Sequence, residues 1–522
     1  MDSEPGSYRV WKHGVLWLVA MGVVMARIPT FWLSGEFVAE DAWVFFPEAF
    51  NSSWTSSILT PYAGYFHLVP RILAEFLSIF PLVFQPYAYA FVGMGLNALF
   101  FSLFFLPHFR HVIASDNARA VVVIILALVP HSENMGFILG LHWYIAFLLP
   151  LLFIMEFPKS RQGKWSMYGC SVACLWSSPS NLVLAPFLLW DIKTGSDPNK
   201  RKWSQFTLLN LIVVAIFIIL LRFRDAARTG EFLLSQIPHA IDRLVVRSWL
   251  GTSFVGQRIA NHIVDIQPWL MDILGLSMAA LIGWLLYRMR KHPLFFHAIT
   301  LTACALFMIG LSMTRSLYIA ELGQIELTRH VRYLTGPSVL IVLVLLCSLY
   351  HLAREKHIRL FYAACGLQAL LLAFGTTAEN HWARQPETFR IRDFADEISS
   401  FQNEYLKTGS PAVLYIPSEV PYWGPLLKSE EQLIEEPSTT LLQVPTITSR
   451  GETFKSWLGG LETKDKAQEY YHPKLGTLTF NGLAEGRIWF RDTEDRLLFT
   501  SELLSPYLWR MEGLHFELLK LE

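Results

Sequence analysis

Long apolar runs bordered by Arg, Lys and Trp are the feature that most limits what this chain can fold into. Residues 211–221 and 339–346 are two such runs. A helix that crosses the hydrocarbon core of a bilayer needs about 20 mostly apolar residues, and basic and Trp side chains mark its ends. Hydrophobic residues make up 53% of the chain and charged residues only 16%, against about 25% charged in soluble domains. The sequence therefore predicts a polytopic, all-α membrane domain.

Hydropathy predicts single spans and one helical hairpin within residues 1–378, which form the predicted transmembrane domain. The hairpin covers residues 166–190, because basic clusters precede and follow it and Ser177-Ser178-Pro179-Ser180-Asn181 breaks its middle. Counted as two short helices, it brings the prediction to about eleven crossings. The single spans lie near residues 14–33, 88–107, 118–130, 135–155, 205–222, 268–287, 294–313, 332–350 and 358–378.

The basic residues predict which side of the membrane each loop faces. Loops rich in Lys and Arg stay in the cytoplasm, which places the N-terminus inside and the C-terminus outside. The first loop, residues 34–87, and the tail, residues 379–522, are then both extracytoplasmic. Loop 223–267 carries five arginines and is the exception, but its length weakens the rule. The clusters assigned to the cytoplasm are Arg9/Lys12, Arg110/His111/Arg119, Lys159/Arg161/Lys164, Lys193/Lys200/Arg201/Lys202, Arg288/Arg290/Lys291 and Arg354/Lys356/Arg359.

The tail has the pattern of a small mixed α/β soluble domain. Residues 387–406 form a charged amphipathic helix candidate. Residues 412–416, 475–480, 487–490 and 496–500 have the composition and alternation of strands.

The charge totals exclude one class of function. Acidic and basic residues are equal in number, 43 each. A chain without net charge has no global field that would attract nucleic acid, so the bilayer is the predicted partner and nucleic acid is not.

An acidic group in the first loop is the strongest candidate for chemistry. It consists of Glu36, Glu40 and Asp41, directly outside the first predicted span. A carboxylate at a membrane surface can act as a general base on a hydroxyl, or hold a divalent cation such as Mg²⁺ or Mn²⁺. If a metal is bound, Asp41 and Glu40 are its predicted ligands. The alternative is a solvated acidic loop without a function of its own.

A second candidate is a basic group at the outer mouth of the span that begins near residue 332. Arginine offers a planar fork of donors that matches phosphate, so these side chains predict a phosphate site. Interfacial anchoring of long basic side chains is the alternative. The group comprises Arg315, Arg329, His330, Arg332 and Tyr333.

Further polar residues, together with Glu36 and Tyr333, are predicted to line an outward-facing cavity. His67 and Arg71 are predicted to face a lipid-phosphate pocket, where Arg71 would bind the phosphate. They precede an amphipathic run, residues 72–84, which is too short to span and is typical of a helix lying along the bilayer. Glu133 follows the short span 118–130, so it is expected below the membrane surface, and His142 lies near the same level. The alternatives are a surface anchor and a structural, hydrogen-bonded histidine.

The layout resembles the GT-C class of membrane glycosyltransferases. Members of that class carry an acidic motif in the first large external loop, then an interfacial helix, and often a soluble C-terminal domain. The corresponding parts here are Glu40-Asp41, residues 72–84 and residues 379–522.

The resemblance implies transfer of a sugar from a polyprenyl-phosphate donor to a lipid, glycan or protein acceptor on the non-cytoplasmic face. Asp41 would be the catalytic base with Glu40 as its neighbour, and Arg332 would contact the donor phosphate. Inversion at the anomeric carbon is expected. The tail lacks the Trp-Trp-Asp motif of oligosaccharyltransferases, which argues against transfer to asparagine.

Other classes of function stay open at this point. Short helices that meet within the membrane also occur in transporters and flippases, although no inverted repeat is visible in the sequence. A polysaccharide polymerase or ligase would share the outward chemistry. A structural assembly subunit would show no turnover.

Overall fold

The chain divides into two compact units. Unit 1 comprises Met1–Pro29, Leu59–Pro70 and Phe91–Asn380, and unit 2 comprises Thr30–Ile58, Arg71–Ala90 and His381–Glu522. The computed structural model describes residues 10–29, 32, 41–46, 49, 54–62, 64–80, 84–129, 135–224, 241–318, 334–354 and 357–376, and short strands between residues 412 and 520.

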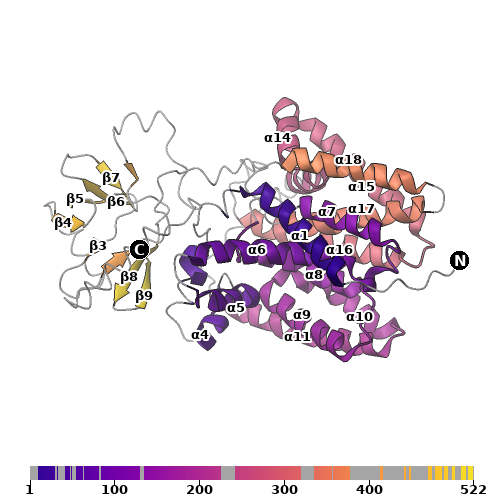
Figure 1. The fold of residues 1–522 in the computed structure, drawn as a ribbon, viewed down its shortest axis with the longest axis horizontal. Helices are drawn as coiled ribbons and strands as arrows, with labels where there is room; N and C mark the ends of the chain where they lie inside the picture. The colour runs from indigo at the N-terminus through magenta and orange to yellow at the C-terminus, as the bar shows by residue number, and fades with distance from the viewer. Residues whose placement is uncertain are drawn as a thin grey trace. The chain divides into compact units, whose positions relative to one another are not determined.

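Helices account for most of the described residues up to 376 (Figure 1). They are α1 (Val10–Arg27), η1 (Asp41–Phe45), α4 (Trp54–Leu59), α5 (Leu68–Leu77), α6 (Gln85–Ser102), η3 (Leu103–Phe105), η4 (Pro107–Phe109), α7 (Asp116–Leu128), α8 (Leu141–Ile154), α9 (Arg161–Ser177), η6 (Pro179–Leu184), α10 (Ala185–Thr194), α11 (Pro198–Arg224), η9 (Ile241–Gly251), α13 (Thr252–Val255), α14 (Gln257–Ile266), α15 (Pro268–Met289), α16 (Phe295–Tyr318), α17 (Thr335–Ala353) and α18 (Ile358–Thr376).

Six of the described helices are long and apolar enough to cross a membrane, and a bent helix pair brings the number to as many as seven. These helices indicate a multi-pass membrane protein, and all six coincide with predicted spans. The predicted span 118–130 corresponds to α7, which has only 13 residues. The six candidates are Val10–Arg27, Gln85–Phe105, Pro198–Leu221, Pro268–Met289, Thr335–Ala353 and Ile358–Gly375.

Two further predicted spans correspond to shorter apolar helices, Leu141–Ile154 and Phe295–Leu311. The first of them begins six residues later than predicted, because residues 135–140 form bends and turns. The count of about eleven crossings therefore stays a prediction.

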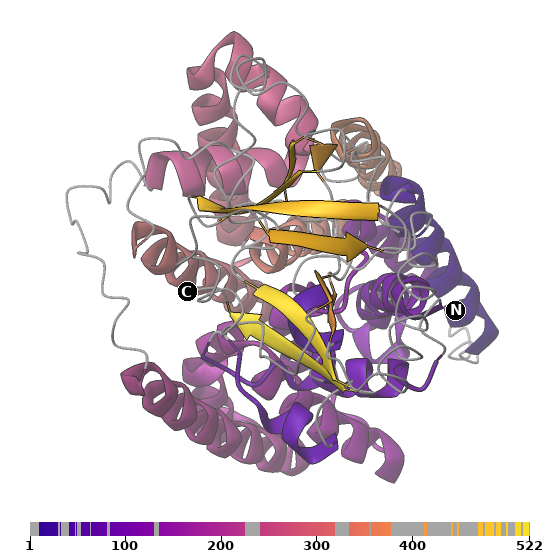
Figure 2. The ribbon, with the colours of Figure 1, turned by 90° about the vertical axis from the view of Figure 1, so that its left-hand side faces the viewer.

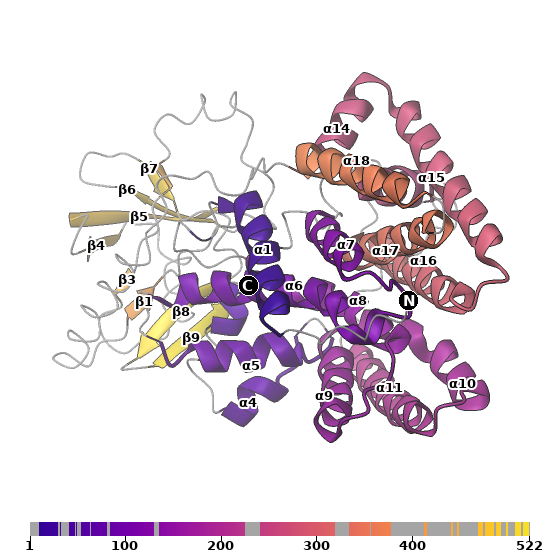
Figure 3. The same cartoon turned by 45° about the vertical axis from the view of Figure 1, so that its right-hand side comes forward.

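Helix α17 is the centre of unit 1. It packs against α7, α8, α15, α16 and α18, and Figure 3 shows it among them. Buried residues make up 83% of its span but only 22% of the spans in α11 and α15. The outer helices expose large apolar side chains such as Ile216 on α11 and Ile273 on α15. Such faces suit hydrocarbon as solvent, whereas soluble monomers rarely expose large apolar patches.

The predicted hairpin appears as a sharply broken helix pair. Arg161–Ser177 and Pro179–Thr194 are bent by 119° relative to each other. At the break the buried amide of Asn181 donates hydrogen bonds to the carbonyl oxygens of Cys174, at 3.0 Å, and Ser178, at 3.3 Å. Backbone freed from a helix inside a membrane needs such protein partners. The Ser/Pro/Asn segment therefore breaks the helix where the sequence predicted.

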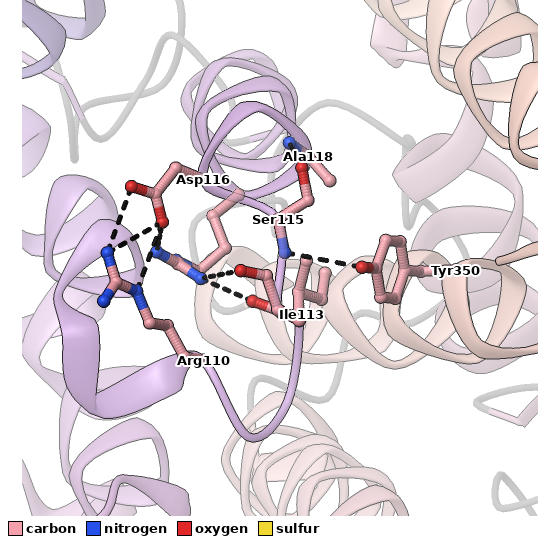
Figure 4. Close-up of polar contacts among 8 residues, drawn as sticks. Arg110, Ile113, Ser115, Asp116, Ala118 and Tyr350 are labelled. Atoms are coloured by element: carbon pink, nitrogen blue, oxygen red, sulfur yellow. Dashed lines mark hydrogen bonds and ion pairs between the residues drawn. The ribbon is translucent and has the colours of Figure 1, made fainter. Parts of the chain in front are cut away.

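Polar contacts hold the start of α7, and Figure 4 shows Asp116 there beside Arg110. Ser115 caps the helix by accepting a hydrogen bond from the Ala118 amide. Asp116 pairs with both Arg110, at 3.2 Å, and the buried Arg119. Partial burial raises the pKa of Asp116, but the hydrogen bonds and charges of the two arginines outweigh it and lower that pKa below its usual value. Arg110 and Arg119 therefore stabilise the start of α7 through their ion pairs with Asp116.

Several of the predicted cytoplasmic segments lie together at one end of unit 1. His111 Nδ1 lies 3.8 Å from the Glu156 carboxylate. His351 Nε2 lies 2.6 Å from the carbonyl oxygen of Val112, and the His351 ring lies 4.5 Å from that of His292. The loops before α7, before α9 and before α16 therefore meet the end of α17.

The described strands form two sheets, which Figure 2 shows as two groups of arrows. One has the order β3-β1-β8-β9 and is antiparallel, and the other has the order β2-β7-β6-β5-β4 with β2 parallel to β7. The strands are β1 (Ala412–Leu414), β2 (Thr440–Leu441), β3 (Thr446–Ile447), β4 (Gln468–His472), β5 (Gly476–Ala484), β6 (Arg487–Arg491), β7 (Leu497–Phe499), β8 (Tyr507–Glu512) and β9 (His515–Lys520).

Strands β1, β5, β6 and β7 fall where the sequence pattern predicts strands. The predicted helix at residues 387–406 lies outside the described residues. A separate α/β domain outside the membrane stays a prediction.

A close backbone approach in unit 1 generates a stability prediction. A Cβ atom on Gly375 would overlap the carbonyl oxygen of Val255, whereas one on Gly366 of the same helix would meet nothing within 4 Å. We expect Gly375→Ala to destabilise the protein by about 2 kcal/mol, because overpacking a tight contact forces the backbone to move. Thermal unfolding in detergent should show a lower Tm for Gly375→Ala and an equal or higher Tm for Gly366→Ala, because alanine favours the helix more than glycine does. Equal Tm values for the two variants would contradict the close approach.

Candidate functional site

Helix α5 turns its charged residues inward and its apolar residues outward. Ile72 and Phe76 are 41% and 53% exposed, whereas Arg71 and Glu75 are 1% and 2% exposed. A helix in water shows the opposite arrangement. The helix begins and ends earlier than the predicted run 72–84, because residues 78–80 form turns. An apolar outer face suits a helix that lies in the membrane interface, and it leaves the polar face for a site inside the protein.

Asp41 lies in the same buried region of unit 2 as Arg71. It is the first residue of η1, a short π-helix, and it is 1% exposed. Phe45 ends η1, and the guanidinium carbon of Arg71 lies 5.4 Å from the centre of its ring. A cation at that distance from a ring face is attracted by the ring electrons. The contact between η1 and α5 is therefore made by Phe45 and Arg71, and Asp41 lies at the other end of the same five-residue helix.

Helix α4 supplies the next contacts. Arg71 Nη1 donates a hydrogen bond of 2.8 Å to the backbone oxygen of Ser57. The Ser57 hydroxyl in turn hydrogen-bonds the Glu75 carboxyl group. Ser57 is itself buried. This one residue of α4 therefore hydrogen-bonds two side chains of α5, those of Arg71 and Glu75. A guanidinium positioned in this way presents a planar set of donors, which is the chemistry that recognises phosphate.

Glu75 and Tyr89 complete the cluster, which we call the Asp41 cluster: Asp41, Ser57, Arg71, Glu75 and Tyr89. Burial raises the pKa of Glu75, against the opposing effects of the Ser57 hydrogen bond and the Arg71 charge. The buried Tyr89, on α6, lies within electrostatic reach of both Asp41 and Glu75. A buried carboxyl group with a raised pKa beside an arginine, as Glu75 is, can hold and transfer a proton.

Three members of this cluster were not predicted from the sequence. Arg71 and Asp41 were, but Ser57, Glu75 and Tyr89 were not. The spacing of Arg71 and Glu75, four residues apart, places both on one face of a helix. Charged residues on one face of an otherwise apolar, interfacial helix were therefore the available signal for Glu75. Nothing in the pattern of residues around Ser57 or Tyr89 indicates a role.

A second cluster lies in unit 1 and contains the two histidines predicted for the cavity. The His67 ring stacks on Tyr65 with centroids 3.8 Å apart and meets His142 edge to face at 5.2 Å. Trp143 lies against His142 at 4.2 Å. His142 Nδ1 hydrogen-bonds the carbonyl oxygen of Leu139, which can only accept, so in the neutral ring Nε2 carries the lone pair.

His67 has a left-handed backbone with φ of 52°, and among the described residues it is alone in this apart from glycines. Such a conformation costs a non-glycine residue about 1 to 2 kcal/mol. It persists where the surroundings hold it in place, and strained residues of this kind gather at functional sites.

The remaining predicted site residues cannot be placed in either cluster. The side chain of Arg315, on α16, and seven other residues lie outside the described part of the chain: Glu36, Glu40, Glu133, Arg329, His330, Arg332 and Tyr333. Their roles stay predictions. Among the described residues no group of three or more His, Cys, Asp and Glu could hold a metal ion, and a site made by Asp41 with Glu40 is not covered by that search.

Comparisons with protein-family models, with curated proteins and with solved structures found no match to this chain.

The backbone of His67 generates a prediction that separates its ring from its conformation. His67→Ala and His67→Gly both remove the stacked ring, but only glycine adopts a positive φ without strain. We therefore expect His67→Gly to be more stable than His67→Ala by about 1 kcal/mol. Thermal unfolding of the two variants side by side measures the difference. A more stable alanine variant would show that the left-handed conformation is absent.

Proposed function

We propose that the protein is a membrane glycosyltransferase that moves a sugar from a polyprenyl-phosphate donor to a lipid, glycan or protein acceptor. The observation that carries the proposal is the burial of Asp41 and Arg71 in one cluster behind the outward apolar face of α5. A substrate with a long apolar chain and a phosphate would approach along the membrane and need a cation inside the protein. The apolar outer face of α5 suits the apolar chain, and Arg71 is the cation for the phosphate.

The proposed chemistry is a direct displacement. Asp41 accepts the proton of the acceptor hydroxyl while that oxygen attacks the anomeric carbon of the sugar. The bond from the anomeric carbon to the phosphate oxygen breaks, and the electron pair leaves with the polyprenyl phosphate. Arg71 stabilises the negative charge that grows on this phosphate. Attack opposite the leaving group inverts the anomeric centre.

The further predicted residues have places in the same scheme. Arg315, Arg329, His330 and Arg332 would add donors to the phosphate, and Glu40 would stand beside the base. If Mg²⁺ or Mn²⁺ takes part, Asp41 and Glu40 would hold it. Arg71 already brings positive charge to the cluster, so the scheme needs no step through a metal.

We also propose the full topology that the sequence predicts. The N-terminus lies in the cytoplasm, the chain crosses the membrane about eleven times, and a mixed α/β domain at residues 379–522 lies outside. The meeting of several basic loops at one end of unit 1 supports a common cytoplasmic side. Residues 34–58 and 71–87 of the first loop belong to the same compact unit as the C-terminal strands, which supports a common side for these regions.

A transporter or flippase is the second candidate, and the broken pair α9 and η6–α10 favours it. Helices interrupted at buried polar residues line substrate sites in many transporters. Reconstitution in liposomes distinguishes the two: a transporter moves its substrate without altering a covalent bond, and a transferase produces a new glycosidic bond. A polymerase or ligase would use the same displacement with a glycan as acceptor.

Replacing the proposed base tests the transferase directly. We expect Asp41→Asn to lower sugar transfer from a polyprenyl-phosphate donor at least 100-fold, in line with the usual effect of a general base of about 10² to 10⁴. Asparagine has the same shape and accepts no proton, so the donor should still bind. Radiolabelled product formation by the purified protein measures the rate.

The exposed Asp265 on α14 offers a matched control. Asp265→Asn removes the same charge and should leave transfer unchanged. Wild-type rates in Asp41→Asn would rule out Asp41 as the base.

A further inference from the structure

Helices α9, α10 and α11 bring a basic segment of the chain to one end of unit 1. Helix α11 packs against both α9 and α10, and Figure 3 shows the three helices together. Lys164 Nζ, near the start of α9, donates a hydrogen bond of 3.3 Å to Asn199 Oδ1 in the first turn of α11. Helix α10 ends at Thr194, shortly before α11 begins. The start of α9, the end of α10 and the start of α11 therefore lie at one place.

Most of the basic side chains at this place are unpaired. The Lys and Arg residues of the segment 156–202 are Lys159, Arg161, Lys164, Lys193, Lys200, Arg201 and Lys202. Lys200 places its amine 5.0 Å from the centre of the buried Phe153 ring. The others are exposed or half-buried, and none of them forms an ion pair with a described residue. We call these others, without Lys200, the basic patch.

The acidic side chains of the same segment do not neutralise the patch. Asp191 is buried and accepts a hydrogen bond of 2.6 Å from the Ser204 hydroxyl. The Glu156 carboxylate lies 3.8 Å from His111. Asp197, in the connection between α10 and α11, accepts the backbone N–H of Asn199 at 2.8 Å. The patch therefore keeps a positive field that is open to an anion from outside the chain.

The exposed side chains of α11 place the patch at the edge of the hydrocarbon. Arg201 and Lys202 are exposed, and Leu209 and Ile212, further along the helix, are exposed and apolar. The change from basic to apolar takes about two turns, or about 10 Å. The headgroup layer on each side of a bilayer is about 5 to 8 Å deep, and long basic side chains reach across it. The patch therefore lies at the level of the lipid phosphates.

Tryptophans on α9 and α10 give the same level. Trp165, which follows Arg161 by one turn on α9, is 67% exposed. Trp190, which precedes Lys193 on α10, is 55% exposed, and its neighbour Leu189 is exposed as well. Exposed Trp side chains are typical of the boundary between hydrocarbon and headgroups. All three helices thus place basic groups and an apolar or Trp surface at the same boundary.

We infer that the basic patch binds the phosphate headgroup of an anionic phospholipid, with Trp165 and Trp190 beside its glycerol and acyl chains. Clusters of Lys and Arg at the end of membrane helices attract anionic lipid headgroups. Helices α9 and α11 both begin at the patch, so the partial positive charges of their first turns add to its field. A free phosphate ion would meet the same cations but would gain nothing from the apolar surface. The inference does not depend on sugar transfer.

The test is native mass spectrometry of the purified full-length protein in detergent. The probes are dioleoyl phosphatidylglycerol and, separately, dioleoyl phosphatidylcholine, whose headgroup has no net charge. Wild type should bind phosphatidylglycerol about tenfold more tightly than phosphatidylcholine. The quadruple variant Arg161→Gln/Lys164→Gln/Arg201→Gln/Lys202→Gln should lose this preference. Equal affinity of the wild type for the two lipids overturns the inference.

A matched quadruple variant removes the same number of exposed cations from other helix ends. It is Arg288→Gln/Arg290→Gln/Lys291→Gln/Arg359→Gln, and all four of its positions are exposed. Arg288 and Arg290 lie against the rings of Trp284 and Tyr287, at 5.9 Å and 3.8 Å. This variant should keep the preference for phosphatidylglycerol. Equal losses in the two quadruple variants would show a general effect of charge and overturn the patch as the binding surface.

A single substitution tests the patch without removing any cation. Asp197→Asn makes the patch more positive, and asparagine can still accept the Asn199 N–H at the start of α11. The affinity for phosphatidylglycerol should rise about threefold, whereas that for phosphatidylcholine should not change. An unchanged or lower affinity for phosphatidylglycerol contradicts the inference.

An excess of inorganic phosphate distinguishes a lipid from a soluble anion. The lipid should stay bound, because its acyl chains and the Trp side chains contribute to the binding. Displacement of phosphatidylglycerol by inorganic phosphate would show that the patch serves a soluble anion, and it would overturn the lipid as occupant.

Discussion

Hydrocarbon offers no hydrogen bonds, and this constraint governs how polar groups are placed in this protein. Arg27, at the end of α1, donates to the carbonyl oxygen of Ala127 on α7 at 3.1 Å. The Asn181 amide, at the break between α9 and η6, donates hydrogen bonds to three carbonyl oxygens. In each case a polar side chain satisfies backbone that the surrounding lipid could not, as membrane proteins require. Apolar side chains are then free to cover the outside of the outer helices.

The same constraint explains why α5 exposes its apolar side chains and buries its charged ones. Its position beside lipid favours Ile72 and Phe76 on the outer surface, so Arg71 and Glu75 must be accommodated within the protein. Burial of charge is tolerated only with partners. Ser57 accepts a hydrogen bond from Arg71, Phe45 lies against its guanidinium group, and the charge of Arg71 acts on Glu75. Buried titratable groups of this kind occur at functional sites and in structural ion-pair networks.

The two candidate clusters are adjacent in the chain although they belong to different units. His67 immediately precedes α5, and Arg71 follows one helical turn later. The left-handed backbone at His67 thus marks the point where the chain leaves the aromatic cluster and enters the helix that carries Arg71.

Apolar run length and loop charge are local properties, so the chain alone indicated a helical membrane protein, six of its long spans and the broken pair at residues 177–181. Asp41, Arg71, His67 and His142 stood out because polar residues beside a membrane are unusual. The sequence did not predict which of these residues contact one another, because such contacts depend on long-range packing. Ser57, Glu75 and Tyr89 join Asp41 and Arg71 because η1, α4, α5 and the start of α6 pack together, and the pairing of His67 with His142 crosses 75 residues of chain. Contacts between distant segments depend on the whole fold, and only the tertiary structure could supply them.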